Sequence, residues 1–196
     1  KRKTTWKPVA AIFGVLLLAS LIFGALIGWK FYQRAVAIKQ KVDKLESYLS
    51  PSPKVDQIGE IAPLVHDLRV EVDALNADAA PYLGLTQSLG WVPTYGSDLA
   101  QASDLLEMAI GLSTAADEGI QALLPSLDVV IQQDQALDVL AILEGLQEAE
   151  PKLLSAQVAL AQAQAARDRI DSESLSPYLR KIIEKRIDPL LDSIAG

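Results

Sequence analysis

An uncharged segment from Pro8 to Trp29 constrains this chain more than any other feature. Its 22 residues include no Asp, Glu, Lys, Arg or His. As an α-helix they would extend about 33 Å, enough to cross a hydrocarbon core of about 30 Å. A buried helix of a water-soluble protein is rarely apolar on every face over such a length. The sequence therefore predicts a transmembrane helix over residues 8–29.

The residues on both sides of this segment fit a helix that spans a bilayer. Trp6, Trp29 and Tyr32 occupy the positions of an interfacial aromatic belt. A cleavable signal peptide is the alternative, but its apolar part is usually only about 7–15 residues long and is followed by small residues. Lys and Arg are almost equally frequent on the two sides. We expect a short basic tail, residues 1–7, in the cytoplasm and an extracytoplasmic domain after the span.

Outside the basic tail the chain is acidic and rich in small aliphatic residues. Residues 8–196 carry 14 Lys and Arg against 25 Asp and Glu, which disfavours nucleic acid as a partner because phosphate binding needs clustered basic side chains. Half of the residues are hydrophobic but only 6% are aromatic, and no window alternates as a strand would, so the sequence predicts an all-α fold. Cysteine is absent, which excludes disulfides and thiolate metal sites.

Apolar residues continue at heptad spacing from the predicted span into the next segment. They are Leu17, Leu21, Gly24, Gly28, Phe31, Ala35, Ile38, Val42, Leu45 and Leu49. This spacing predicts one helix of about 42 residues that leaves the bilayer without a break. Ser50 to Pro53 should end it. A second helix follows with the seam Ile58, Ile61, Val65, Leu68, Val72, Leu75 and Ala79. Residues 30–79 are thus predicted to form an antiparallel helical hairpin, in which Pro63 either kinks the second helix or marks its first turn.

The rest of the chain predicts a loop and then an elongated bundle of antiparallel helices. Residues 80–97 contain three Gly and two Pro, and we expect them to form the longest non-helical connection. In residues 98–196 a helix capped by Ser97 and Asp98 should end at Pro125. A helix from about Ser126 to Glu150 should follow, either continuous or broken near Gln132–Gln135, and further helices should start at Pro151 and after Ser176. The expected buried faces are Leu99, Ala102, Leu106, Ala109, Ala116, Ile120 and Leu123; Leu154, Val158, Ala161 and Ala165; and Leu179, Ile182, Ile183, Ile187, Leu190 and Ile194.

Two sets of residues are candidates for binding another molecule. Ser20, Gly24 and Gly28 form a small-xxx-small stripe that would let another transmembrane helix approach closely, although glycine is also simply common in such helices. Trp91, Pro93 and Tyr95 place large amphipathic rings on a Pro/Gly scaffold, which suits a docking loop. The alternative, which we favour from the sequence alone, is that Trp91 packs under the end of the bundle.

The sequence does not predict an enzyme. His66 is the only histidine, and a helical histidine without converging partners is expected to be solvated or hydrogen-bonded rather than catalytic. Acidic residues without the spacing of a calcium loop are expected to form a solvated face. They are Asp117, Glu118, Asp168, Asp171 and Glu173. We predict no catalytic residue, no cofactor and no metal site.

The order of these segments resembles that of a known family. The membrane anchor and helical hairpin are followed by LGWVPTYGSDLAQASDLLEMA, by Leu123-Leu124-Pro125 and by AEPKLLSAQVALAQAQAARDRI. This arrangement is similar to the N-terminal region of DUF4012 proteins, with GWVPTYGSDL as its most specific part. The resemblance implies a bacterial single-pass protein whose anchor and helical region precede a further exported domain, and it implies no activity. The run that opens that further domain in the family is not found before Gly196.

Three hypotheses of function follow. The first is a structural role, in which a single-pass membrane protein uses an exported helical domain to pack with, or scaffold, other subunits of a homo- or hetero-oligomeric membrane complex. The second is a helical sensor or ligand-binding stalk, which would need a cytoplasmic output module. The third is the anchor region of an envelope enzyme whose catalytic domain lies beyond residue 196. The heptad seam that continues out of the predicted span favours the first.

Overall fold

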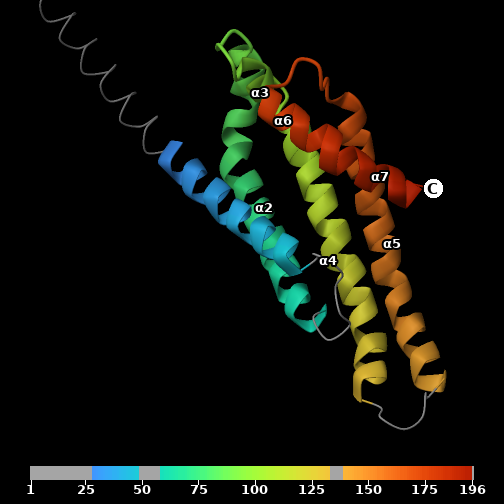
Figure 1. Cartoon of the computed structure of the whole chain (residues 1–196). Coiled ribbons are helices and arrows are strands. Elements are labelled where there is room, and N and C mark those ends of the chain that lie inside the picture. Colours follow the sequence, from blue (N-terminus) through green and yellow to red (C-terminus); the bar gives the residue numbers. More distant parts are fainter. Residues whose placement is uncertain (1–27, 49–57, 133–138, 196) are drawn as a thin grey trace, which may run out of the picture. The chain divides into compact units, whose positions relative to one another are not determined.

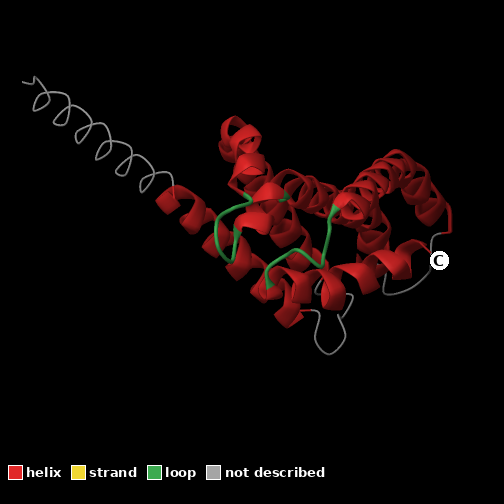
Figure 2. Ribbon diagram, turned by 90° about the horizontal axis from the view of Figure 1, so that it is seen from above, coloured by secondary structure: helices red, strands yellow, loops and turns green. Residues whose placement is uncertain are grey.

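The structure is a computed structural model that describes residues 28–48, 58–132 and 139–195. These residues are almost entirely helical, which confirms the all-α prediction (Figures 1 and 2). After the helix of residues 28–48, the chain forms α2 (Ile58–Thr86), the 3₁₀ helix η2 (Gln87–Leu89), α3 (Gly96–Ala100), α4 (Ala102–Gln132), α5 (Val139–Arg169), α6 (Pro177–Ile182), the π-helical turn η3 (Ile183–Ile187) and α7 (Asp188–Ala195). Residues 1–40 and 41–196 are separate units, and the packing below is that of the second.

The long N-terminal helix is confirmed only where the structure describes it. Residues 28–48 form one helix with no break between Trp29 and Ala35. Most of the predicted span lies outside the described residues. Within the part of the chain that is described, no helix combines the length and apolarity needed to cross a membrane. The turn predicted at Ser50 to Pro53 also lies outside the described residues.

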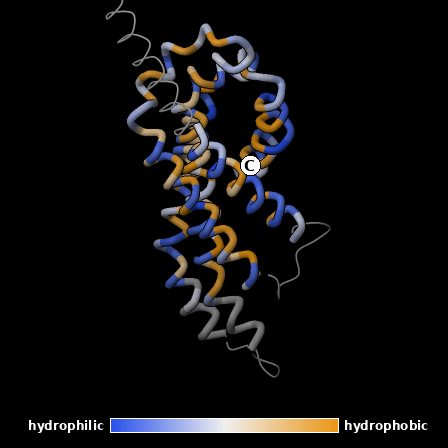
Figure 3. Tube along the Cα trace, turned by 90° about the vertical axis from the view of Figure 1, so that its left-hand side faces the viewer, coloured by the Kyte–Doolittle hydropathy of each residue, from blue (hydrophilic) through white to orange (hydrophobic). Residues whose placement is uncertain are grey.

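Three long helices, α2, α4 and α5, make up most of the second unit (Figure 1). Hydrophobic and hydrophilic residues alternate along these helices in the trace of Figure 3. The buried residues of α2 are Ile61, Val65 and Val72. They belong to the predicted seam of this helix, which is confirmed at these positions.

Helices α4 and α5 are antiparallel and approach closely through small residues. The ion pair of Asp104 with Arg169 lies at one end of this pair of helices, and the contact of Gln121 with Lys152 lies farther along it. A Cβ atom on Gly111 would lie only 2.7 Å from the backbone oxygen of Ala159 and 2.8 Å from the Cβ of Ala163. Glycine is therefore required at 111 for the two backbones to pack at this distance.

The faces predicted to be buried on α4 and α5 are wrong in part. On α5 the predicted face (Leu154, Val158, Ala161 and Ala165) is exposed, and the alanines Ala159, Ala163 and Ala166 are buried instead. On α4 the predicted residues Ala116 and Leu123 are exposed. The physical reason is that the alanine face of α5 allows the closer approach to α4 at Gly111, whereas the leucine and valine face would hold the helices apart.

Several predicted helix ends are also wrong, because the helices run through their prolines. Pro125 lies inside α4, Pro151 inside α5, and Pro63 and Pro81 inside α2. An interior proline costs about 3 kcal/mol, which packing along helices of 29 to 31 residues offsets. Since α2 continues to Thr86, the predicted loop of residues 80–97 is much shorter than expected, with residues 90–95 outside helical structure.

The C-terminal helices pack against α4 and α5 around one apolar cluster. It consists of Met108, Ala166, Ile170, Leu175 and Ile183. The last helix begins after Ser176 as predicted, but it contains the π-helical turn η3 just before Pro189. The wider turn shifts the buried face by one residue, so Leu191 is buried and the predicted Leu190 is exposed. Arg167 holds α7 with two hydrogen bonds to Asp188, of 2.6 and 2.9 Å.

Candidate functional site

The turn between η2 and α3 is a compact structure that glycine makes possible. The amide of Val92 donates to the carbonyl of Leu89 at 2.9 Å, and the amide of Gly96 donates to the carbonyl of Val92 at 2.8 Å. A Cβ on Gly96 would lie 2.4 Å from the carbonyl oxygen of Gly90, so only glycine fits there. Thr94 has φ = 72°, a conformation that a β-branched residue rarely adopts. The turn therefore holds one strained residue in a closed backbone loop.

This turn exposes the side chains that were predicted as a docking loop. Trp91 is 77% and Tyr95 61% exposed, and Pro93 is exposed as well. The prediction that Trp91 packs under the end of the bundle is wrong. Leu175 and Ile170 already fill that end, and backbone hydrogen bonds close the turn without a ring beneath it. The predicted cap is wrong too, because α3 begins at Gly96 without a side-chain cap.

The predicted transmembrane packing residues fall mostly outside the described residues. Ser20 and Gly24 are among those that the structure does not describe. Gly28 is exposed at the start of the described helix, and a Cβ placed on it would meet no atom within 4 Å. The small-xxx-small contact therefore stays a prediction.

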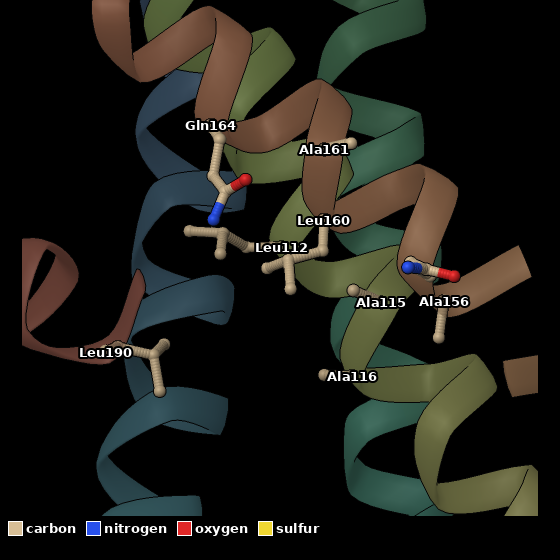
Figure 4. A pocket seen from close by; sticks show the side chains of 9 residues that line it. Leu112, Ala115, Ala116, Ala156, Leu160, Ala161, Gln164 and Leu190 are labelled. Atoms are coloured by element: carbon tan, nitrogen blue, oxygen red, sulfur yellow. The ribbon is translucent and has the colours of Figure 1, made fainter. Parts of the chain in front are cut away.

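An apolar groove of about 660 Å³ lies along α4 and α5 and is bordered by α7 (Figure 4). Of its nine lining residues, four are alanines, three are leucines and two are glutamines. Its lining residues are Leu112, Ala115, Ala116, Ala156, Gln157, Leu160, Ala161, Gln164 and Leu190. The sequence does not predict this groove. The heptad spacing of Leu154, Val158 and Ala161 indicates an apolar face, but local spacing favours placing that face in the core.

The exposed side of α5 continues this apolar surface. Leu153, Leu154 and Val158 are exposed, and the 14 residues 153–166 contain no charged side chain. We call residues Leu154, Val158 and Ala161 the α5 stripe. In this chain 22% of the residues are charged, so an exposed segment of almost four helical turns without a charge is unusual.

A buried carboxylate joins α2 to α4. Asp117 is 1% exposed, and its Oδ2 lies 3.1 Å from His66 Nδ1 and 3.0 Å from Arg69 Nη1. Gln121 Nε2 donates to its Oδ1 at 3.0 Å. Arg69 also donates to Glu118 at 2.9 Å. We call these five residues the Asp117 cluster. The prediction that Asp117 lies on a solvated face is wrong, whereas the prediction of a hydrogen-bonded His66 is confirmed.

The neighbours of Asp117 keep it ionised. Burial raises the pKa of the Asp117 carboxyl, but hydrogen bonds from Gln121, His66 and Arg69 outweigh burial and hold this pKa below its ordinary value. Burial lowers the pKa of the Arg69 guanidinium, and hydrogen bonds to Glu118 and Asp117 bring it above its ordinary value. The cluster is therefore an ion pair that holds two helices together.

We expect the free energy of unfolding to decrease in acid, in part through Asp117. The pKa of Asp117 is lowered in the folded chain. The ionised carboxyl therefore contributes fully to the free energy of unfolding above about pH 3.9, the ordinary pKa of aspartate. This contribution is lost as the pH falls through the lower pKa of the folded state. Between about pH 5 and pH 2, the free energy of unfolding in urea should decline less steeply for Asp117→Asn than for the wild type. Parallel declines in the two proteins would contradict this assignment.

The three candidate sites differ in the side chains that they present. The hydrogen bonds of the Asp117 cluster connect helices, and the turn and the groove present rings and aliphatic side chains. Within the ranges that the structure describes, no three His, Cys, Asp or Glu residues are grouped as metal ligands would be. No family model matches this chain, and no curated protein or solved structure matches it either.

Proposed function

We propose that this chain is a single-pass membrane-anchored interaction protein, whose exported helical domain binds an α-helix of another subunit of a membrane complex. Residues 8–29 would be the anchor, and residues 1–7 would lie in the cytoplasm. The resemblance to DUF4012 proteins agrees with this arrangement and stays a prediction. The observation that carries the binding role is the uncharged α5 stripe beside the apolar groove.

The chemistry of this surface indicates the kind of partner. A charged side chain placed on residues 153–166 would lose its hydration without gaining a counter-ion, since that segment has no charge. A helix with an uncharged aliphatic face would instead bury Leu154 and Val158 while its own larger side chains occupy the alanine-lined groove. The net charge of −7 favours a different protein over a second copy, because two acidic domains repel each other.

A pair of matched valines tests this proposal. Val158 on the α5 stripe is 53% exposed and Val70 on α2 is 51% exposed, so a glutamate at either position should leave folding unchanged. We expect Val158→Glu to weaken the association with the partner at least about tenfold, because the partner helix would bury the glutamate charge in an apolar contact. Val70→Glu should leave it unchanged. Quantitative co-purification of the full chain from native membranes measures the association of each variant with the partner.

Site-specific photo-cross-linking identifies the partner face. A cross-linker at position 158, but not at position 70, should reach residues on the uncharged face of a helix in another protein. If both positions cross-link equally, if position 158 captures only a second copy or lipid, or if Val158→Glu does not weaken the association, the proposed role is wrong. Circular dichroism and thermal unfolding of both variants show whether they are folded.

A further inference from the structure

We propose that the turn carrying Trp91 and Tyr95 docks on the surface of the bilayer that anchors this chain. The inference rests on the proposed anchor at residues 8–29 but uses neither the groove nor the α5 stripe. The occupant is the interfacial region of the membrane, where the polar end of an aromatic ring meets water and its apolar body meets acyl chains.

The side chains at this end of the bundle have the chemistry of a membrane-interface belt. Trp91 and Tyr95 project from the turn, and Leu85 in the last turn of α2 is exposed as well. Tyr178 lies in the first turn of α6 and is also exposed. The amide of Ser176 donates to Asp98 of α3 at 2.7 Å, so α6 begins at the same end of the bundle as the turn (Figure 1).

The conformation of the turn indicates that the exposure of Trp91 and Tyr95 has a role. Thr94 is held at φ = 72°, a conformation that strains a β-branched residue. Gly96 packs directly against the backbone of Gly90. A chain without a role for this turn could relieve the strain with a longer connection, because lengthening a surface loop costs little. The rigid turn instead holds Trp91 and Tyr95 in place before docking, so that little backbone entropy of the turn is lost when docking occurs.

The direction of residues 41–48 favours the bilayer as the occupant. These residues belong to the same unit as α2. Tyr48 hydrogen-bonds to Glu60 near the start of α2, whereas Lys41 lies 3.6 Å from Asp67 and 3.7 Å from Glu71. The two segments are therefore antiparallel, and the N-terminal end of residues 41–48 points toward the end of α2 that carries the turn. The predicted span precedes this segment in the chain.

The charges around the turn bear on the kind of lipid that it would contact. Charged residues of both signs lie near the turn, among them Asp98, Glu173 and Arg180, so docking should not require anionic lipid.

Tryptophan fluorescence of the full chain in vesicles tests this inference. Trp6→Phe and Trp29→Phe leave Trp91 as the one tryptophan. In phosphatidylcholine vesicles we expect its emission to move to shorter wavelength and to be quenched by lipids brominated near the headgroup, at a depth of about 5–10 Å. A matched control carries Trp91→Phe and Leu123→Trp in the same background. Position 123 is exposed on α4 and lies about 30 Å along this helix from its start at Ala102, so its tryptophan should be unquenched.

Carbonate extraction of the same vesicles separates the two proposals. If the protein resists extraction and Trp91 is unquenched, or is quenched no more than the tryptophan at 123, docking of the turn is wrong while the anchor stands. If carbonate removes the protein, the anchor itself is wrong. Protection of Trp91 from an aqueous quencher in native membranes, without quenching by brominated lipid, would mean that a protein covers the turn and would overturn this inference.

Discussion

Replacing Gly111 by valine is expected to lower the free energy of unfolding by about 3 kcal/mol. Even a methyl group at this position would lie 2.7 Å from a backbone oxygen of Ala159. Backbone cannot move aside as a flexible side chain does, so α4 and α5 must separate, and the alanines between them then lose contact. Urea unfolding followed by circular dichroism measures the change.

A second glycine on the same helix provides the control. A Cβ on Gly119 would meet nothing within 4 Å, so Gly119→Ala should stabilise the chain by about 0.5–1 kcal/mol through helix propensity. Gly111→Ala gains the same propensity and should nevertheless destabilise, because the contact with Ala159 and Ala163 outweighs it. Equal effects of the two alanine substitutions would contradict the close approach of α4 to α5.

Replacing Arg69 by leucine is expected to lower the free energy of unfolding by about 2–4 kcal/mol, somewhat less than for a fully buried pair. The substitution removes a hydrogen bond from Asp117, which is 1% exposed and would keep its charge in a site with fewer donors. Arg69 itself is 28% exposed, so solvent screens part of the interaction. Hydrogen exchange should show the loss first in α2, since the Asp117 cluster joins α2 to α4.

A double-mutant cycle distinguishes the ion pair from simple packing. In Arg69→Leu with Asp117→Leu the buried charge disappears together with its partner, and apolar side chains replace both. We expect the double variant to regain most of the stability lost in Arg69→Leu. If instead the two losses add, the two side chains do not interact and the ion pair does not hold α2 to α4.

The local features of the fold were predictable where one helix face is distinct from the rest. Ile61, Val65 and Val72 of α2 are buried as predicted, because every charged side chain of that helix lies outside the predicted seam. The start of the last helix after Ser176 was also predictable, since proline favours the first turn. The ends at Pro125 and Pro151 were not, because local backbone preference is weaker than the packing that continues on both sides of each proline.

The candidate sites show the same division. Trp91, Pro93 and Tyr95 could be recognised from their composition, but not whether Trp91 is buried or exposed. Asp117 looked like part of a solvated face, since Glu118 beside it is also acidic. Its burial depends on Arg69 and His66, which lie about 50 residues earlier in the chain. Pairing over such a separation leaves no signal in local spacing.

By itself the sequence determined the all-α class, the period of each helix and the presence of an uncharged segment near the N-terminus. Only the tertiary structure decided which of two apolar faces α5 buries. Both faces satisfy the helical period, so the period cannot choose between them. The choice depends on how closely α4 can approach, and Gly111 allows contact with the alanine face. That packing leaves Leu154 and Val158 exposed, and a partner helix could therefore bind there.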